Sequence, residues 1–104
     1  MTVLGATPRG RALRRSGARP GDRIFVTGTL GGAGLALARS QSRGAKLRHL
    51  PTPRLAAGRV LARMKQSGAC VDLSDGFASD LDHILEASRV GAAIDVARIP
   101  LPDG

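Results

Sequence analysis

The order of apolar and polar positions along the chain predicts a mixture of short strands and helices. Short runs rich in apolar and β-branched residues, bounded by Gly, Pro, Ser and Asp, are typical of strands. Apolar residues repeated at intervals of three or four are typical of helices that bury one face. In chain order, strands are expected over 2–7, 23–28, 69–73 and 92–101, and helices over 35–40, 54–65 and 74–91. This order indicates an α+β or α/β fold class and excludes a helical bundle or an all-β sandwich.

The helix expected over 74–91 has the clearest pattern. Ser74 or Asp75 is expected to cap its start, because short polar side chains accept hydrogen bonds from the first free backbone N–H groups. The helix before it is expected to begin with Thr52 as cap and Pro53 in the first turn, and to end at Gly68. The buried face of the 74–91 helix is expected to comprise Phe77, Leu81, Ile84, Leu85 and Ser88.

Length and composition describe one domain with a modest core. The chain has 104 residues, of which 42% are hydrophobic. The single cysteine, Cys70, excludes an internal disulfide framework and is most simply a small buried residue. No apolar run reaches the roughly 20 residues of a membrane-spanning helix, and no secretion signal is visible, so a cytoplasmic location is expected.

Charge is distributed unevenly along the chain. Residues 1–65 contain 14 Lys and Arg against one acid, a net charge of +13, whereas residues 66–104 have a net charge of −5. A basic surface attracts phosphates, and clustered carboxylates attract Mg²⁺ or Ca²⁺. With only Phe25 and Phe77 as aromatic residues, the chain offers little for stacking nucleic-acid bases. A site that combines basic residues and carboxylates would suit a metal–nucleotide complex better than nucleic acid, and solvated arginines that bind no ligand remain the alternative.

The segment 72–76, Asp-Leu-Ser-Asp-Gly, is the strongest candidate for chemistry. It lies where a strand is expected to end and a helix to begin. Alternation along an extended segment places Asp72 and Ser74 on one face, and a turn at Asp75 brings the second carboxylate around. Two carboxylates and a hydroxyl beside a helix start can hold Mg²⁺ and a phosphate. Plain helix capping by the same residue types remains the alternative.

The other candidate residues give weaker evidence of a function. The glycines over 28–34 lack both the G-K-[ST] ending and the G-x-G-x-x-G spacing, so neither nucleotide-binding fingerprint is present. His49 and His83 have no partner at metal-ligand spacing, and His83 is expected to face solvent. No residue can be assigned as a catalytic base or nucleophile from its spacing.

Three stretches of the chain together carry a family resemblance: GRALRRSGARPGDRIFVTGTLG (10–31), RHLPTPRLAAGRVLA (48–62) and VDLSDGFASDLDHILEASRVGAAIDVARIPLP (71–102). They resemble the thiamine-monophosphate kinase family, which is related to aminoimidazole-ribonucleotide synthetase and selenophosphate synthetase. The resemblance implies an α+β fragment, made of the start of the superfamily's C-terminal α/β domain, with a mixed sheet and helices packed on it. It further implies that residues 1–22 end the N-terminal domain and its connection, and that 23–104 form part of the C-terminal domain.

The resemblance also implies an activity: ATP-dependent phosphorylation of thiamine phosphate to thiamine diphosphate, with Mg²⁺ as cofactor. By position, Asp72 and Asp75 match metal ligands, and Ser74 and Arg15 match ATP contacts. A homodimer is implied for the full-length family. The fragment alone is expected to be inactive, because the segments that carry most metal-binding acids in the family are not found in it. The alternatives are another ATP-using member of the superfamily, or a basic nucleic-acid-binding or non-catalytic interaction module.

Overall fold

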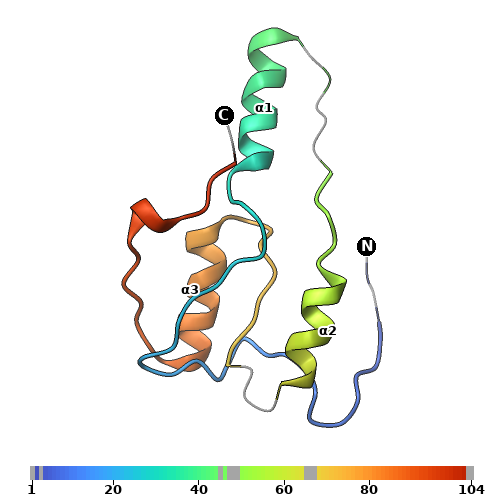
Figure 1. Ribbon diagram of the computed structural model, residues 1–104, viewed down its shortest axis with the longest axis vertical. Helices are drawn as coiled ribbons and strands as arrows, with labels where there is room; N and C mark the ends of the chain where they lie inside the picture. The colour runs from blue at the N-terminus through green and yellow to red at the C-terminus, as the bar shows by residue number, and fades with distance from the viewer. Residues whose placement is uncertain (1, 3, 45, 47–49, 65–67, 103–104) are drawn as a thin grey trace. The chain divides into compact units, whose positions relative to one another are not determined.

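The computed structural model describes residues 2, 4–44, 46, 50–64 and 68–102. Its elements in the described residues are three α-helices and one short 3₁₀ helix (Figure 1). The connections between them are turns and extended segments. The elements are α1 (Gly32–Arg43), α2 (Leu55–Arg63), α3 (Phe77–Ser88) and η1 (Val96–Arg98).

The predicted α+β fold with a mixed sheet is wrong, because the described residues contain helices and no strand. The segments expected over 23–28 and 69–73 run without a ladder partner, and η1 lies within 92–101. Residue 3 of the segment 2–7 lies outside the described residues. A strand is defined by repeated hydrogen bonds to a neighbour, whereas among the described residues Cys70 makes a single backbone bond to a distant segment, from its N–H to the Arg14 carbonyl at 2.8 Å. The sequence has the apolar pattern of strands, but the described residues lack the hydrogen-bonded pairing that would make a sheet.

The three helices confirm the predicted helical segments, with shifted bounds. α1 begins at Gly32, within the expected glycine-rich bend, and continues to Arg43, with Gly44 in the left-handed conformation ending it. α2 begins at Leu55, so Thr52 and Pro53 lie before the helix and do not cap it. α3 begins at Phe77, and its N-cap position is Gly76, with no side-chain cap hydrogen bond. Capping by Ser74 or Asp75 is therefore wrong.

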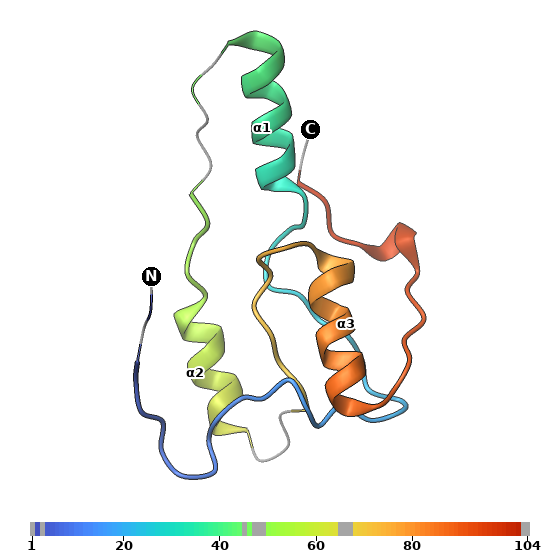
Figure 2. The ribbon, with the colours of Figure 1, turned by 180° about the vertical axis from the view of Figure 1, so that it is seen from behind.

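The chain forms two compact units, each composed of two stretches of sequence. Unit 1 contains residues 1–23 and 55–92, and unit 2 contains residues 24–54 and 93–104. Within unit 2, the Leu30 N–H donates to the Pro100 carbonyl at 2.8 Å, and Asp95 caps η1 through the Ala97 N–H. Within unit 1, the segment leading into α3 runs between α2 and α3, as seen from both sides (Figures 1 and 2).

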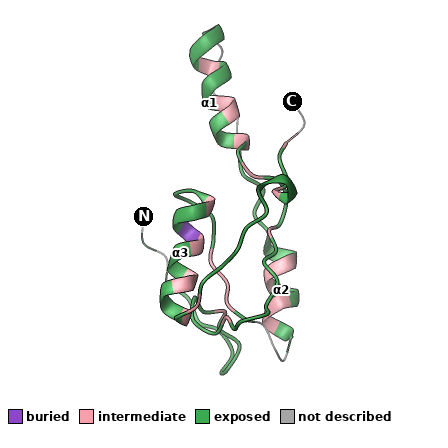
Figure 3. Cartoon of the chain, turned by 90° about the vertical axis from the view of Figure 1, so that its left-hand side faces the viewer, coloured by how far each residue is buried: buried purple, intermediate pink, exposed green. Residues whose placement is uncertain are grey.

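Burial is slight throughout the described residues. Among the described residues only Asp80 is buried, with 3% of its surface exposed, and it is coloured purple on α3 in Figure 3. No described hydrophobic side chain is buried, and Phe25 is 82% exposed. Cys70, expected to be buried, is half-buried. The polar contacts of unit 1, more than a closed apolar core, therefore define the backbone around the predicted site.

Candidate functional site

All four predicted site residues lie in unit 1 and have exposed side chains. Asp72, Ser74 and Asp75 belong to the loop 72–76 that precedes α3, and Arg15 belongs to the N-terminal segment of the unit. No side-chain hydrogen bond or ion pair to another described residue engages any of the four. Their oxygens and guanidinium are therefore available to a ligand.

The backbone of the loop is held by Asp80, which lies in the first turn of α3. One carboxylate oxygen of Asp80, Oδ2, accepts hydrogen bonds from three successive N–H groups: those of Ser74 at 2.8 Å, Asp75 at 3.1 Å and Gly76 at 3.3 Å. Gly76 has φ 129°, a conformation that L side chains rarely adopt. A helix carboxylate thus folds the preceding loop back over the helix start.

These contacts lower the pKa of the Asp80 carboxyl below its ordinary value. The backbone N–H of Ser74 is the largest cause, and those of Asp75 and Gly76, with the electrostatic influence of His83, act in the same direction. Burial acts against them, because it disfavours the charged form. The carboxylate is therefore ionised near neutral pH and binds the loop as an anion.

The Asp80 carboxylate stands where sequence reasoning placed a phosphate. The N–H groups of 74–76 donate to Asp80, so they are not available to cradle an anionic ligand. A phosphate at this loop would have to be bound by side chains instead. Ser74 Oγ has no hydrogen-bond partner among the described residues, and the side chains of Asp72 and Asp75 are exposed.

The segment carrying Arg15 is fixed at the opposite end of α3. Ser88, in the last turn of that helix, accepts hydrogen bonds at its Oγ from the N–H groups of Gly17 and Ala18, each at 3.2 Å. Its hydroxyl donates to the Arg15 carbonyl at 3.1 Å. Figure 2 shows this N-terminal segment passing the C-terminal ends of both α2 and α3.

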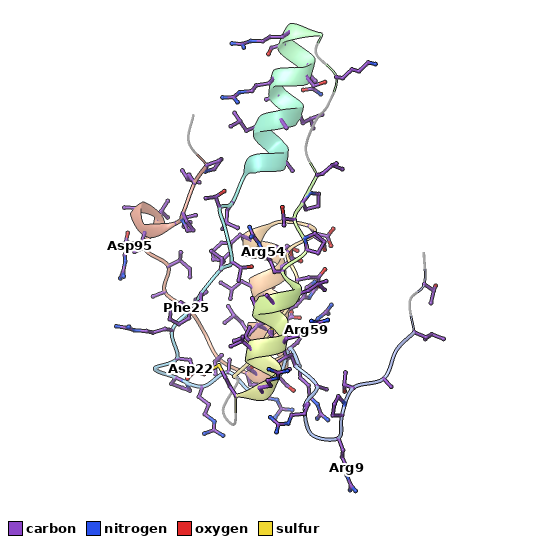
Figure 4. The ribbon with its side chains drawn as sticks, turned by 45° about the vertical axis from the view of Figure 1, so that its right-hand side comes forward. Arg9, Asp22, Phe25, Arg54, Arg59 and Asp95 are labelled. Carbon is purple, nitrogen blue, oxygen red and sulfur yellow. The ribbon has the colours of Figure 1, made fainter. Side chains whose placement is uncertain are left out.

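Arg11 takes a structural position in the same segment. Its Nη1 donates to the carbonyls of Ala62 at 3.3 Å and Arg63 at 2.9 Å, the last residues of α2. Arg9, by contrast, points away from the chain in Figure 4, at the tip of the turn closed by the Arg11 N–H on the Pro8 carbonyl. The arginines of this segment therefore differ in what they contact.

The structure thus brings the predicted residues to two ends of one helix, and not into mutual contact. From Asp80 to Ser88 the helix rises about 12 Å at about 1.5 Å per residue. A ligand spanning Arg15 and the loop would have to extend along α3.

Two residues that matter here were given no chemical function by the sequence reasoning. Asp80 lies four residues after Gly76, where a carboxylate in the first turn can reach back to free N–H groups. Ser88 was placed on the apolar face of its helix, and a hydroxyl on such a face needs hydrogen-bond partners. That mismatch was the signal that could have singled it out.

The described residues contain no group of three or more His, Cys, Asp or Glu side chains that could hold a metal ion. Asp72 and Asp75 still fit Mg²⁺ as a partial donor set, because this ion commonly takes one or two protein carboxylates and completes its shell with phosphates and water. His83 is exposed, as predicted, and His49 lies outside the described residues. No described helix has the length and apolar character needed to traverse a membrane.

The family described as AIR synthase related protein, C-terminal domain, matches residues 19–104. The chain belongs to this family. The chain is 47% identical to the thiamine-monophosphate kinase of Escherichia coli K12, over 97% of this chain and 34% of that relative.

Two further relatives are also named thiamine-monophosphate kinase. The thiamine-monophosphate kinase of Methanospirillum hungatei is 46% identical over 97% of this chain and 35% of the relative. That of Rhodopirellula baltica is 38% identical over 99% of this chain and 29% of the relative. The resemblance predicted from the three sequence stretches is confirmed. The chain spans about a third of the length of these curated relatives.

Proposed function

We propose that this chain is part of an ATP-dependent thiamine-phosphate kinase, in which Arg15 and Ser74 bind ATP phosphates and Asp72 and Asp75 bind Mg²⁺. One observation carries the proposal. In a chain aligned along 97% of its length with thiamine-monophosphate kinases, the loop 72–76 presents two carboxylates and a hydroxyl to solvent on a backbone that Asp80 fixes. In a loop that only caps a helix, these side chains would accept hydrogen bonds from the N–H groups at the helix start. Here it is the Asp80 carboxylate that accepts hydrogen bonds from the loop N–H groups.

In the proposed reaction, a terminal phosphate oxygen of thiamine phosphate bonds to the γ-phosphorus of ATP. The bond between that phosphorus and the β–γ bridging oxygen breaks, and thiamine diphosphate and ADP are the products. Such a transfer depends on alignment and charge neutralisation more than on covalent help from the protein. Mg²⁺, when bound, supplies neutralising charge to the phosphate oxygens.

The residues of this chain would contribute binding and orientation. The guanidinium of Arg15 can donate two parallel hydrogen bonds to phosphate oxygens, and Ser74 Oγ can donate one. The carboxylates of Asp72 and Asp75 offer hard oxygen ligands to the metal. We assign no general base to this chain. The proposal includes a cytoplasmic location, where ATP and Mg²⁺ are supplied, and the implied homodimer stays a prediction.

The first test of the function uses a chimera in which residues 1–104 replace the aligned third of the E. coli relative. It should form thiamine diphosphate from ATP and thiamine phosphate. Asp72→Asn and Asp75→Asn, which keep side-chain size and remove the charge, should each lower turnover at limiting Mg²⁺ by about tenfold or more. Asp82→Asn, at an exposed position of α3, is the matched control and should leave turnover unchanged. Normal turnover of both loop variants would show that the loop does not bind metal.

A second test separates a defined phosphate site from a generally basic surface. Arg15→Lys keeps the charge but loses the planar fork, so it should raise the KM for ATP in the chimera by several-fold. Arg9→Lys and Arg14→Lys should have little effect. Arg11 is not a suitable control, because it holds the end of α2. Equal, small effects at positions 9, 14 and 15 would contradict the site and favour the nucleic-acid alternative.

A further inference from the structure

The hydroxyl of Ser88 is saturated by the backbone of a single distant segment. A serine hydroxyl has one donor hydrogen and two acceptor sites, and here all three are used within residues 15–18. These partners lie 70 to 73 positions earlier in the sequence. Ser88 thus joins the last turn of α3 to the segment that carries Arg15.

The other side of that segment is held by the stretch that leads into the loop. The Cys70 N–H donates to the Arg14 carbonyl at 2.8 Å. A Cβ at Gly17 would lie 3.2 Å from the Gly68 carbonyl oxygen, and the φ of Gly17 is 123°. The peptide groups on both sides of Arg15 are therefore fixed, and only glycine suits position 17.

The Arg15 side chain contrasts with its backbone. It is exposed, and it makes no hydrogen bond or ion pair with another described residue. A guanidinium on a side chain that extends from a fixed backbone loses less conformational freedom on binding an anion than one on a mobile segment does. The arrangement is that of a preorganised cation.

The same helix fixes the second ligand segment. Asp80 holds the loop 74–76 at the start of α3, and Ser88 holds 15–18 at its end. Since a helix is stiff over three turns, it sets the distance between the two segments. Loss of either contact would free one segment while the other stayed in place.

We propose that Ser88 is a positioning residue for nucleotide binding, which fixes the backbone of 15–18 so that the Arg15 guanidinium meets the phosphates of Mg·ATP. The proposal rests on the proposed function for the assignment of Arg15 to ATP. It goes further in naming the hydroxyl through which α3 controls that arginine. Ser88 itself touches no substrate.

The test measures Mg·ATP affinity of the full chain by calorimetry, and KM and kcat in the chimera. Ser88→Ala should weaken Mg·ATP binding and raise the KM for ATP by about three- to tenfold, with little change in the KM for thiamine phosphate. Ser88→Thr keeps the hydroxyl and should restore the wild-type values. Ser79→Ala, at an exposed position of the same helix without a hydrogen bond to another described residue, is the control.

A double-mutant cycle decides whether Ser88 acts through Arg15. In the Arg15→Lys background, Ser88→Ala should cause little further loss, because its effect passes through the guanidinium already replaced. Additive losses, or an Ser88→Ala variant that unfolds more easily but keeps its affinity for Mg·ATP, would overturn the proposal.

The outcomes also separate this proposal from the function itself. If the wild-type chain binds Mg·ATP but the chimera makes no thiamine diphosphate, the kinase function fails while the affinities still decide the case of Ser88. If neither the wild-type chain nor the chimera binds Mg·ATP, both are overturned. If the chimera alone binds it, the KM values measured in the chimera decide the case of Ser88.

Discussion

Asp80 and Ser88 act on the backbone of other residues, and this determines what the sequence could reveal about the site. Asp72, Ser74 and Asp75 were recognised because their types and spacing suit metal and phosphate chemistry. The function of Ser88 depends on partners more than 70 residues away, which no local pattern encodes. Asp80 was closer to recognition, since its partners lie within six residues. The prediction that Ser74 or Asp75 caps the helix assigned the accepting side chain to the loop. In the structure, the accepting carboxylate belongs to Asp80, which follows the cap position.

Asp80→Asn tests the anionic contact at the residue scale. The folded-state pKa of Asp80 lies below that of the unfolded chain, roughly 3.9. Its stabilising contribution is therefore fully present above that value and is lost as pH falls through the lower folded-state pKa. Asp80→Asn should thus lower the free energy of unfolding at pH 7 and differ less from wild type at pH 2–3, as measured by urea unfolding.

The exposed Asp82 supplies the control for this pH dependence. Asp82→Asn should follow the wild-type curve across the same pH range, because no hydrogen bond to another described residue holds its carboxylate. A constant difference between Asp80→Asn and wild type at all pH values would indicate that the charge on Asp80 contributes nothing to the loop.

At the scale of elements, helices were predictable and strands were not. Helical spacing and capping are local, so all three helical segments were found, with errors at their ends. The bounds differ at both ends of each helix, and side chains distant in the sequence contact some of these ends, as Arg11 contacts the last carbonyls of α2. Strands depend on non-local partners, so an apolar run such as 23–28 predicts only the tendency to pair. In the described residues these runs form no strand.

Arg11→Ala tests the end of α2. The Arg11 guanidinium binds two of the last carbonyls of this helix, which have no partner within it. Its removal should lower the free energy of unfolding by about 0.5–1 kcal/mol, since the contact is exposed. Amide hydrogen exchange should quicken mainly over 55–63. Arg9→Ala removes a neighbouring exposed arginine and should change neither quantity, and equal effects of the two variants would assign the loss to general charge.

At the scale of the whole molecule, apolar exposure is the dominant feature. The described residues bury no hydrophobic side chain fully, and large apolar side chains are exposed in both units, including Phe25 in unit 2 and Val60 in unit 1. A composition of 42% hydrophobic residues predicted a modest core, and this was wrong for the described residues. Composition supplies apolar residues, but only tertiary packing covers them.

Exposed apolar side chains of this extent should bind a hydrophobic dye while the helices are intact. Anilinonaphthalene sulfonate should fluoresce strongly with the chain at neutral pH, because contiguous apolar surface removes the dye from water. Val60 in α2 and Met64, which directly follows the helix, are 60% and 51% exposed. The double variant Val60→Gln, Met64→Gln should therefore lower the fluorescence with unchanged helical circular dichroism. Arg59→Gln, the control, replaces an exposed polar residue of the same helix and should leave the signal unchanged. A wild-type chain that is helical but does not enhance the dye would show that these side chains are covered in solution.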